Sequence, residues 1–116
     1  MKLKMFDTKN KIAPPYALID NGYCAFTIID DAYFDDIKCV NFFYEFGPLE
    51  YCISVDFDNN ILDISDFDGN EVDISRVRFL SEVEYLELKL EDLENEKINI
   101  KNRIDELKKG NRNVER

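Results

Sequence analysis

The C-terminal third of the chain follows one unbroken periodic pattern, which limits the fold more than any other feature. From residue 83 to 107, the spacing between core-type positions alternates strictly between three and four residues. These positions, called the seam below, are Val83, Leu86, Leu90, Leu93, Lys97, Ile100, Ile104 and Leu107. Such spacing is typical of the a and d positions of a coiled coil. It predicts a long helix whose narrow apolar stripe mediates dimerisation.

Local signals define both ends of this helix. Ser81 and Glu84 have the spacing of a capping box, in which each side chain accepts a hydrogen bond from the other residue's backbone amide. Gly110 follows Lys108 and Lys109, and glycine after a basic last turn commonly ends a helix. We therefore expect a coiled-coil segment over residues 80–110 and a frayed tail over 111–116.

The charge pattern along this helix favours one orientation of a pair. Residues 80–96 hold seven acids and one base, whereas residues 97–112 hold six bases and two acids. Parallel helices would place like charges beside each other, whereas antiparallel helices place opposite charges beside each other. The opposed pairs are Glu82 with Arg103, Lys89 with Glu96, and Glu87 with Lys101. We expect an antiparallel homodimer; the alternative is that the first turns pack on the protein's own sheet and the rest projects.

Residues 16–79 consist of short apolar runs separated by turn residues. Asn21-Gly22 predicts a type I′ hairpin turn, and residues 30–36 indicate an irregular connection. The expected strands are Tyr16–Asp20, Tyr23–Asp30, Ile37–Phe46, Leu49–Phe57, Ile61–Phe67 and Glu71–Phe79. The predicted fold is therefore α+β: a small antiparallel sheet or barrel-like meander of about six strands, followed by one long C-terminal helix. Residues 1–15 form a separate basic segment in this interpretation.

Composition argues against catalysis and against a cofactor. The chain has no histidine and only four glycines, none of them in a phosphate-binding motif. Acids at turn positions lack the shifted pKa that a carboxylate pair needs for glycoside hydrolysis. The cysteines Cys24, Cys39 and Cys52 form no close pair, which indicates free thiols in a reducing compartment rather than a metal site. We expect no enzyme activity, cofactor or metal.

The net charge of −10 disfavours direct binding to nucleic acid or to an anionic membrane. No apolar run approaches the ~20 residues that cross a bilayer, and the opening MKLKMFDTKNK lacks the apolar core of a signal peptide. We expect a cytoplasmic protein, in the host cell if a phage encodes it.

Acidic residues are concentrated in residues 55–75, which contain seven carboxylates and no base. Calcium loops of the EF-hand type need glycine at position 6 and glutamate at position 12. Loops starting at Asp56 or Asp66 have Ile61 and Phe67, or Glu71 and Val77, at those positions. Asp58 and Asp68 are better explained as turn residues.

Turns do not explain the whole excess, because residues 12–75 hold fourteen acids and the single base Lys38. Either the acids form a solvated face that keeps the sheet soluble, or they form a binding face that resembles a phosphate backbone. The candidate face comprises Asp35, Asp36, Asp56, Asp58, Asp63, Asp66, Asp68, Glu71 and Asp73.

The leading hypothesis is a non-catalytic inhibitor that mimics nucleic acid and occupies the basic groove of a nucleic-acid-binding enzyme. Phage counter-defence proteins such as anti-CRISPRs belong to this functional class, although the analogy is one of composition alone. The alternative is an assembly module, such as a virion or scaffold component, that oligomerises through the seam.

Overall fold

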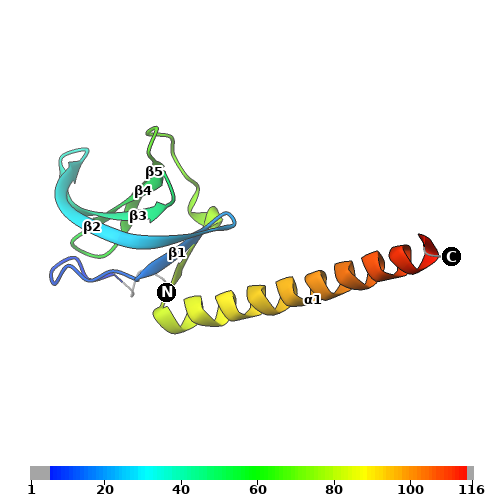
Figure 1. Ribbon diagram of the computed structural model, residues 1–116. Helices are drawn as coiled ribbons and strands as arrows, with labels where there is room; N and C mark the ends of the chain where they lie inside the picture. The colour runs from blue at the N-terminus through cyan, green and yellow to red at the C-terminus, as the bar shows by residue number, and fades with distance from the viewer. Residues whose placement is uncertain (1–5, 115–116) are drawn as a thin grey trace. The chain divides into compact units, whose positions relative to one another are not determined.

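The computed structural model describes residues 6–114, which fall into two compact units that meet between Glu82 and Val83. The first unit, the β domain, is a six-stranded antiparallel sheet that curls into a half-barrel (Figure 1). The second unit is a single helix, α1 (Glu82–Val114), from its second residue onward. The predicted α+β class, with about six antiparallel strands before a C-terminal helix, is confirmed.

The sheet begins as a meander and ends with a crossover. Its strands are β1 (Tyr16–Ile19), β2 (Gly22–Phe34), β3 (Ile37–Phe46), β4 (Leu49–Asp56), β5 (Ile61–Asp66) and β6 (Val77–Leu80). Their order in space is β5-β4-β3-β2-β1-β6. The last strand therefore leaves β5 and pairs with β1, with Ile19 opposite Val77 and Tyr16 opposite Leu80. The meander prediction holds for β1 to β5 and is wrong for β6.

The first hairpin turn differs from the prediction. It is centred on Asp20 and Asn21, one residue earlier than expected, and Asp20 has a φ of 54°. Gly22 instead begins β2, where a Cβ atom would lie 3.1 Å from the ring of Phe46. Glycine at residue 22 thus allows the ring of Phe46 to approach the backbone closely, and it lies outside the turn.

The expected irregular connection over residues 30–36 is also wrong, because β2 continues to Phe34. Cross-strand pairing extends to Phe34 opposite Ile37. Asp35 and Asp36 form the two-residue turn, with φ values of 45° and 67°. Positive φ at both central residues is the type I′ conformation that matches the twist of paired strands. Strand pairing therefore overrides the low β propensity of the acidic residues.

The predicted strand Glu71–Phe79 is replaced by three short structures. Glu71 forms an isolated bridge with Ser65, and Ile74–Arg76 form the 3-10 helix η2. Asp73 caps η2 by accepting a hydrogen bond from the Ser75 amide at 2.8 Å. Only the last part of the predicted strand becomes β6. The Asp73 cap explains the interruption, since it turns the chain from β5 towards β1.

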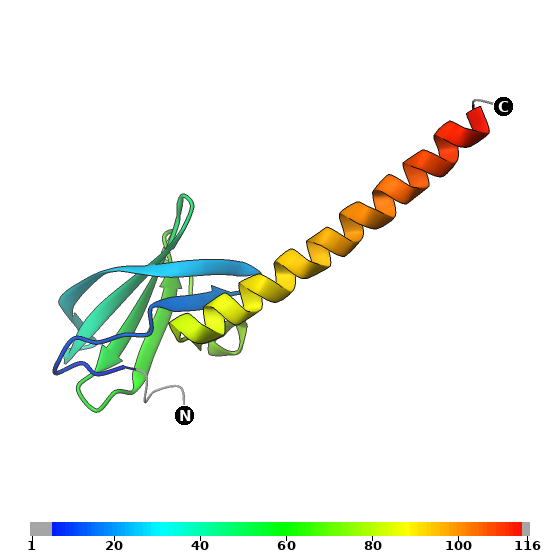
Figure 2. The ribbon, with the colours of Figure 1, turned by 60° about the horizontal axis from the view of Figure 1, so that its bottom comes forward.

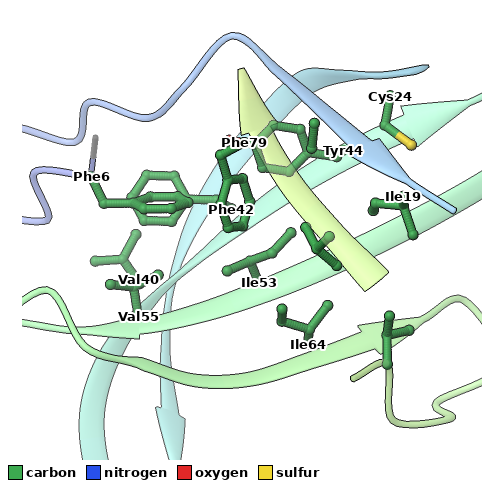
Figure 3. Packing of buried hydrophobic residues seen from close by; sticks show 13 residues of the cluster. Phe6, Ile19, Cys24, Val40, Phe42, Tyr44, Ile53, Val55, Ile64 and Phe79 are labelled. Atoms are coloured by element: carbon green, nitrogen blue, oxygen red, sulfur yellow. The ribbon is translucent and has the colours of Figure 1, made fainter. Parts of the chain in front are cut away.

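Aromatic side chains fill the centre of the β domain (Figure 3). The ring centroids of Phe6 lie 5.0 Å from Phe42 and 4.9 Å from Phe79, and those of Tyr44 and Phe79 lie 6.0 Å apart. The predicted alternation along β4 is confirmed at its centre, where Ile53 and Val55 are buried in this core. Tyr44 donates its hydroxyl to the Pro14 carbonyl at 2.7 Å, so its polar end is satisfied.

The segment before β1 belongs to this core. Phe6 and Thr8 are buried, although sequence reasoning treated residues 1–15 as a separate basic segment. A small bridge joins Asp7 to Ile12, and the backbone amide and hydroxyl of Thr8 both donate to the Asn59 side-chain oxygen at 3.2 Å. These contacts anchor the segment to the β4–β5 turn. Lys2 and Lys4 lie outside the described residues.

Helix α1 is continuous from its start to its end (Figure 2). It begins at Glu82, which places Ser81 at the predicted cap position; the capping-box hydrogen bonds themselves stay a prediction. It passes through Gly110 and ends at Val114, so the predicted end at Gly110 is wrong. Glycine in a helix costs only about 1 kcal/mol relative to alanine, which a long helix tolerates.

Candidate functional site

Two successive ten-residue segments share a motif that sequence reasoning overlooked. Residues 56–65 are DFDNNILDIS and residues 66–75 are DFDGNEVDIS, identical at seven of ten positions. Direct comparison of the two segments in the sequence would have detected the repeat. It accounts for most of the acidic cluster, because each copy contributes aspartates at its first, third and eighth positions.

The first five residues of each copy form the same turn. One oxygen of Asp56 accepts hydrogen bonds from the backbone amides of Asp58 and Asn60, both at 2.9 Å. Asp66 does the same for Asp68 at 3.0 Å and Asn70 at 2.9 Å. The backbone amide donation to Asp56 holds the pKa of that carboxyl below its usual range, most strongly through Asn60. Each motif therefore uses its first aspartate to organise the turn.

The fourth residue of each turn has a positive φ. Asn59 has a φ of 67° and Gly69 a φ of 81°. Both residue types tolerate this left-handed conformation. The repeat thus changes this residue between copies without changing the turn.

The later residues of the two copies line a groove of about 520 Å³. It lies between β5 and the segment that follows the second turn, where a hydrogen bond from the Val72 amide to the Ile64 carbonyl at 2.7 Å joins the two. Its lining residues are Ile61, Leu62, Asp63 and Ile64 from the first copy, and Glu71, Val72, Asp73 and Ile74 from the second. The groove therefore combines apolar walls with three carboxylates.

The structure distributes the nine predicted acidic residues over three places. Asp35 and Asp36 form the tip of the β2–β3 hairpin, and the turns of the repeat hold Asp56, Asp58, Asp66 and Asp68. Asp63, Glu71 and Asp73 come together at the groove. Residues from both copies of the repeat line the groove together, so we treat it as the candidate binding site.

Several acids outside the candidate site also bear on the charge of the β domain. Lys11 pairs with Asp31 at 3.2 Å, and Arg76 forms a two-pronged ion pair with Asp20. The side-chain hydrogen bond from Arg76 lowers the pKa of Asp20. Glu45 and Glu50, in contrast, are directly opposite each other on β3 and β4. Like charges in such a cross-strand pair destabilise a sheet.

The buried titratable groups of the β domain are held neutral. Burial raises the pKa of the buried Cys24 thiol and of the partly buried Cys52 thiol to about 11, and burial also raises the pKa of the Tyr44 hydroxyl. Nucleophilic cysteines instead have a lowered pKa and stand near positive charge. These side chains therefore have the properties of core residues.

Comparisons with known proteins identify no relative. No protein-family model matches the chain, and no curated protein or solved structure matches it either. Within the described residues, no three or more histidine, cysteine, aspartate or glutamate side chains group as metal ligands. Over the same part of the chain, no helix has the length and apolarity needed to cross a membrane.

The seam of α1 is exposed in the single chain. Its seven apolar side chains, from Val83 to Leu107, retain between 44% and 65% of their accessible surface. Apolar stripes of this length are usually covered in a soluble protein. The helix is therefore a second candidate interaction surface.

Proposed function

We propose that the protein is a non-catalytic binding protein whose acidic β domain occupies a basic, nucleic-acid-binding surface of another protein. The observation that carries this proposal is the excess of carboxylates that folding leaves without cationic partners. Residues 6–80 contain fifteen acids and five bases. Such self-repulsion opposes folding. An external cationic partner would neutralise the excess carboxylates.

The groove supports this proposal because it suits long cationic side chains. Lysine and arginine combine an apolar stem with a charged end. The apolar walls of the groove, including Leu62 and Ile74, suit the stems, and Asp63 and Glu71 suit the charges. Neither carboxylate forms an ion pair with any other residue from 6 to 114. A nucleic-acid-binding protein presents many such cations on one surface.

The test is affinity capture from a nuclease-treated cell lysate on the full-length protein, eluted in salt steps. We expect nucleic-acid-binding proteins to elute at moderate salt, since exposed charge pairs are screened by added ions. Excess duplex DNA should release the same proteins, because mimic and nucleic acid would compete for one surface.

Two matched variants locate the contact. The double variant Asp63→Lys with Glu71→Lys reverses charge at the groove and should lose the captured proteins. The double variant Glu45→Lys with Glu50→Lys changes the net charge equally on β3 and β4 and should retain them. Asp73 is left unchanged because it caps η2. Capture that survives high salt, or equal loss with both variants, would contradict the proposal.

The exposed seam favours a second candidate function, that of an assembly module. In that case the helix makes the essential contacts, and the β domain is a solvated appendage. Leu90→Asp or Leu93→Asp would then abolish function, while the groove double variant would be tolerated. The two candidates are therefore distinguished by which of these variants loses activity in the same functional assay.

A further inference from the structure

The hydrogen bonds between β5 and the segment that follows its turn stop partway along the two chains. Asp66 donates its backbone amide to the Asn70 carbonyl at 2.9 Å, and Val72 donates to the Ile64 carbonyl at 2.7 Å. Paired antiparallel residues usually exchange a second bond, which would run here from the Ile64 amide to the Val72 carbonyl. It is not formed, although both residues lie within the described range 6–114. The two arms of the chain diverge there, and the groove of about 520 Å³ lies between them.

The backbone groups left over at this point are directed into the groove. The amide and the carbonyl of a strand residue point to the same side of the strand. Since the Ile64 carbonyl bonds away from β4, the Ile64 amide points away from β4 as well. By the same argument, the Val72 carbonyl points towards β5, as the Val72 amide does. β5 is an edge strand of the six-stranded sheet, so the groove offers a backbone donor on one wall and a backbone acceptor on the other.

The side chains around the groove divide between two faces. Ile64 and Val72 point into the hydrophobic core. Because successive residues of an extended chain point to opposite faces, Asp63 on one arm and Glu71 and Asp73 on the other lie on the outer face. A chain placed between the arms would therefore meet apolar groups on its inner side and carboxylates on its outer side.

We propose that the groove accepts an extended segment of another protein, which enters between the two arms as an added strand and alternates lysine or arginine with apolar residues. A trans peptide group has its oxygen and its N–H on opposite sides. One such group can accept from the Ile64 amide and donate to the Val72 carbonyl at the same time. Strand addition at an exposed sheet edge is a common mode of peptide recognition. The inference rests on the proposed function, because it specifies which part of a basic partner the groove holds.

The geometry of β5 limits the length of the added strand. The β5 wall of the groove runs from Ile61 to Ile64, which is about 13 Å at 3.3 Å per residue. A β-bulge at Leu62 interrupts the register between β5 and β4 there, and bulges restrict pairing along an exposed edge. The groove therefore suits a segment of about four residues, with two cations on the outer face and two apolar side chains on the inner face.

The chain's own residues 1–5, MKLKM, alternate in the same way and are the rival occupant. Charge favours a separate partner. Residues 6–80 contain fifteen acids and five bases, so two additional lysines would leave most of the excess uncompensated. A segment of a basic protein brings further cations with it.

The first experiment measures binding of synthetic peptides to the full-length protein by isothermal titration calorimetry. The probe is a capped peptide of about eight alternating lysine and valine residues, and its control has the same residues as a lysine block followed by a valine block. We expect the alternating peptide to bind at least about 5-fold more tightly. The alternating peptide methylated at every backbone nitrogen should bind at least about 5-fold more weakly, since it cannot donate to the Val72 carbonyl. Equal binding by all three peptides, or no binding, would overturn the inference.

Two double variants of the protein test the carboxylates. Asp63→Asn with Glu71→Gln keeps the shape of both side chains and should weaken binding of the alternating peptide by about 2- to 30-fold, because two exposed charge pairs are lost. Glu45→Gln with Glu50→Gln removes the same charge from β3 and β4 and should leave binding unchanged. Equal weakening by both would overturn the inference.

A third double variant tests the rival occupant. Lys2→Gln with Lys4→Gln removes both lysines of residues 1–5. We expect it to bind the alternating peptide as the wild type does. Binding that occurs only in this variant would identify residues 1–5 as the occupant and would overturn the proposal of a separate partner.

Amide hydrogen exchange locates the contact. The Ile64 amide should exchange at least about 5-fold more slowly when the alternating peptide is bound, because it gains an acceptor. The Ile12 amide, which already donates to the Asp7 carbonyl at 2.9 Å, reports any general stabilisation. Equal slowing at both amides, or no slowing at Ile64, would overturn strand addition.

The peptide experiments and the lysate capture fail independently. If capture succeeds but peptide binding ignores residue order and backbone methylation, strand addition is wrong and the proposed function stands. If binding depends on order and methylation but capture yields no nucleic-acid-binding protein, the strand site stands and the proposed class of partner is wrong.

Discussion

Asp56 and Asp58 lie two residues apart in the same turn, but their carboxylates have different roles. Asp56 accepts hydrogen bonds from two backbone amides and from the Asn60 side chain. Asp58 contributes its backbone amide to that network, and its own carboxylate is exposed. The repeat reproduces this division at Asp66 and Asp68. Aspartate content alone therefore overstates the number of carboxylates available to a partner.

This division predicts a difference in stability between neighbouring substitutions. Asp56→Ala and Asp66→Ala should each lower the free energy of unfolding by about 1 kcal/mol, since each leaves turn amides without their charged acceptor. Asp58→Ala and Asp68→Ala are the matched controls and should change it by less than about 0.5 kcal/mol. Urea unfolding followed by tyrosine fluorescence measures all four. Equal losses at both positions of a turn would show that the hydrogen bonds are not the cause.

The lowered pKa of Asp56 predicts how this contribution depends on pH. A carboxyl whose pKa is lowered by folding stabilises the native state above its unfolded pKa of about 3.9, and the effect disappears as pH falls through the folded value. The stability difference between wild type and Asp56→Ala should therefore be constant from pH 7 to 5 and shrink below pH 4. Urea midpoints at a series of pH values measure it. A difference that grows on acidification would contradict the assignment.

At the level of elements, β3 was predicted with its observed bounds, Ile37–Phe46. Its apolar residues and the following Gly47-Pro48 turn are strong local signals. Sequence reasoning failed where a strand depends on distant partners. The acidic end of β2 has low β propensity and pairs only because β3 lies beside it. This is a tertiary effect that local patterns do not contain.

The candidate site was predictable in part. The carboxylates of Asp63, Glu71 and Asp73 were singled out from composition, but their meeting at one groove depends on the bridge between Ser65 and Glu71. The burial of Phe6 in the core was missed, because one aromatic residue among lysines has no periodic pattern to reveal it. The repeat was detectable from the sequence, and it places Asp63 and Asp73 at the same position of the two copies.

Two glycines offer a direct test of how element context decides the effect of one substitution. Apart from the adjoining backbone, no atom lies within 4 Å of a Cβ placed at Gly69 or at Gly110, so only the backbone conformation distinguishes them. Gly69 has a φ of 81°, and Gly69→Ala should cost about 1–2 kcal/mol. Gly110 lies within α1, and Gly110→Ala should stabilise the helix by up to about 1 kcal/mol. Thermal unfolding and the helical circular dichroism signal measure the two effects; a gain at Gly69 would contradict the turn geometry.

For the whole molecule, the excess negative charge predicts a stability that rises with salt. Repulsion between exposed carboxylates is screened over about 10 Å at 0.1 M salt and about 3 Å at 1 M. The thermal midpoint of the wild type should therefore increase between these conditions. Glu45→Lys replaces the repulsive pair with Glu50 by an attractive one and should add about 0.2–1 kcal/mol at low salt.

The same gain from Glu45→Lys should largely vanish at 1 M salt. Ile98→Asp in α1, which adds a charge far along the chain from that pair, serves as a comparison. If the midpoint of the wild type falls as salt is added, self-repulsion is not the dominant charge effect.

The pairing of β1 with β6 has a consequence for the order in which the β domain is made. Each of the strands from β2 to β5 can pair as soon as it leaves the ribosome, because it contacts the strand just before it. β1, however, keeps an unpaired edge until Leu80 has emerged, and exposed edges promote aggregation. A nascent chain arrested before Val77 should therefore be aggregation-prone, whereas one arrested within α1 already carries a complete β domain.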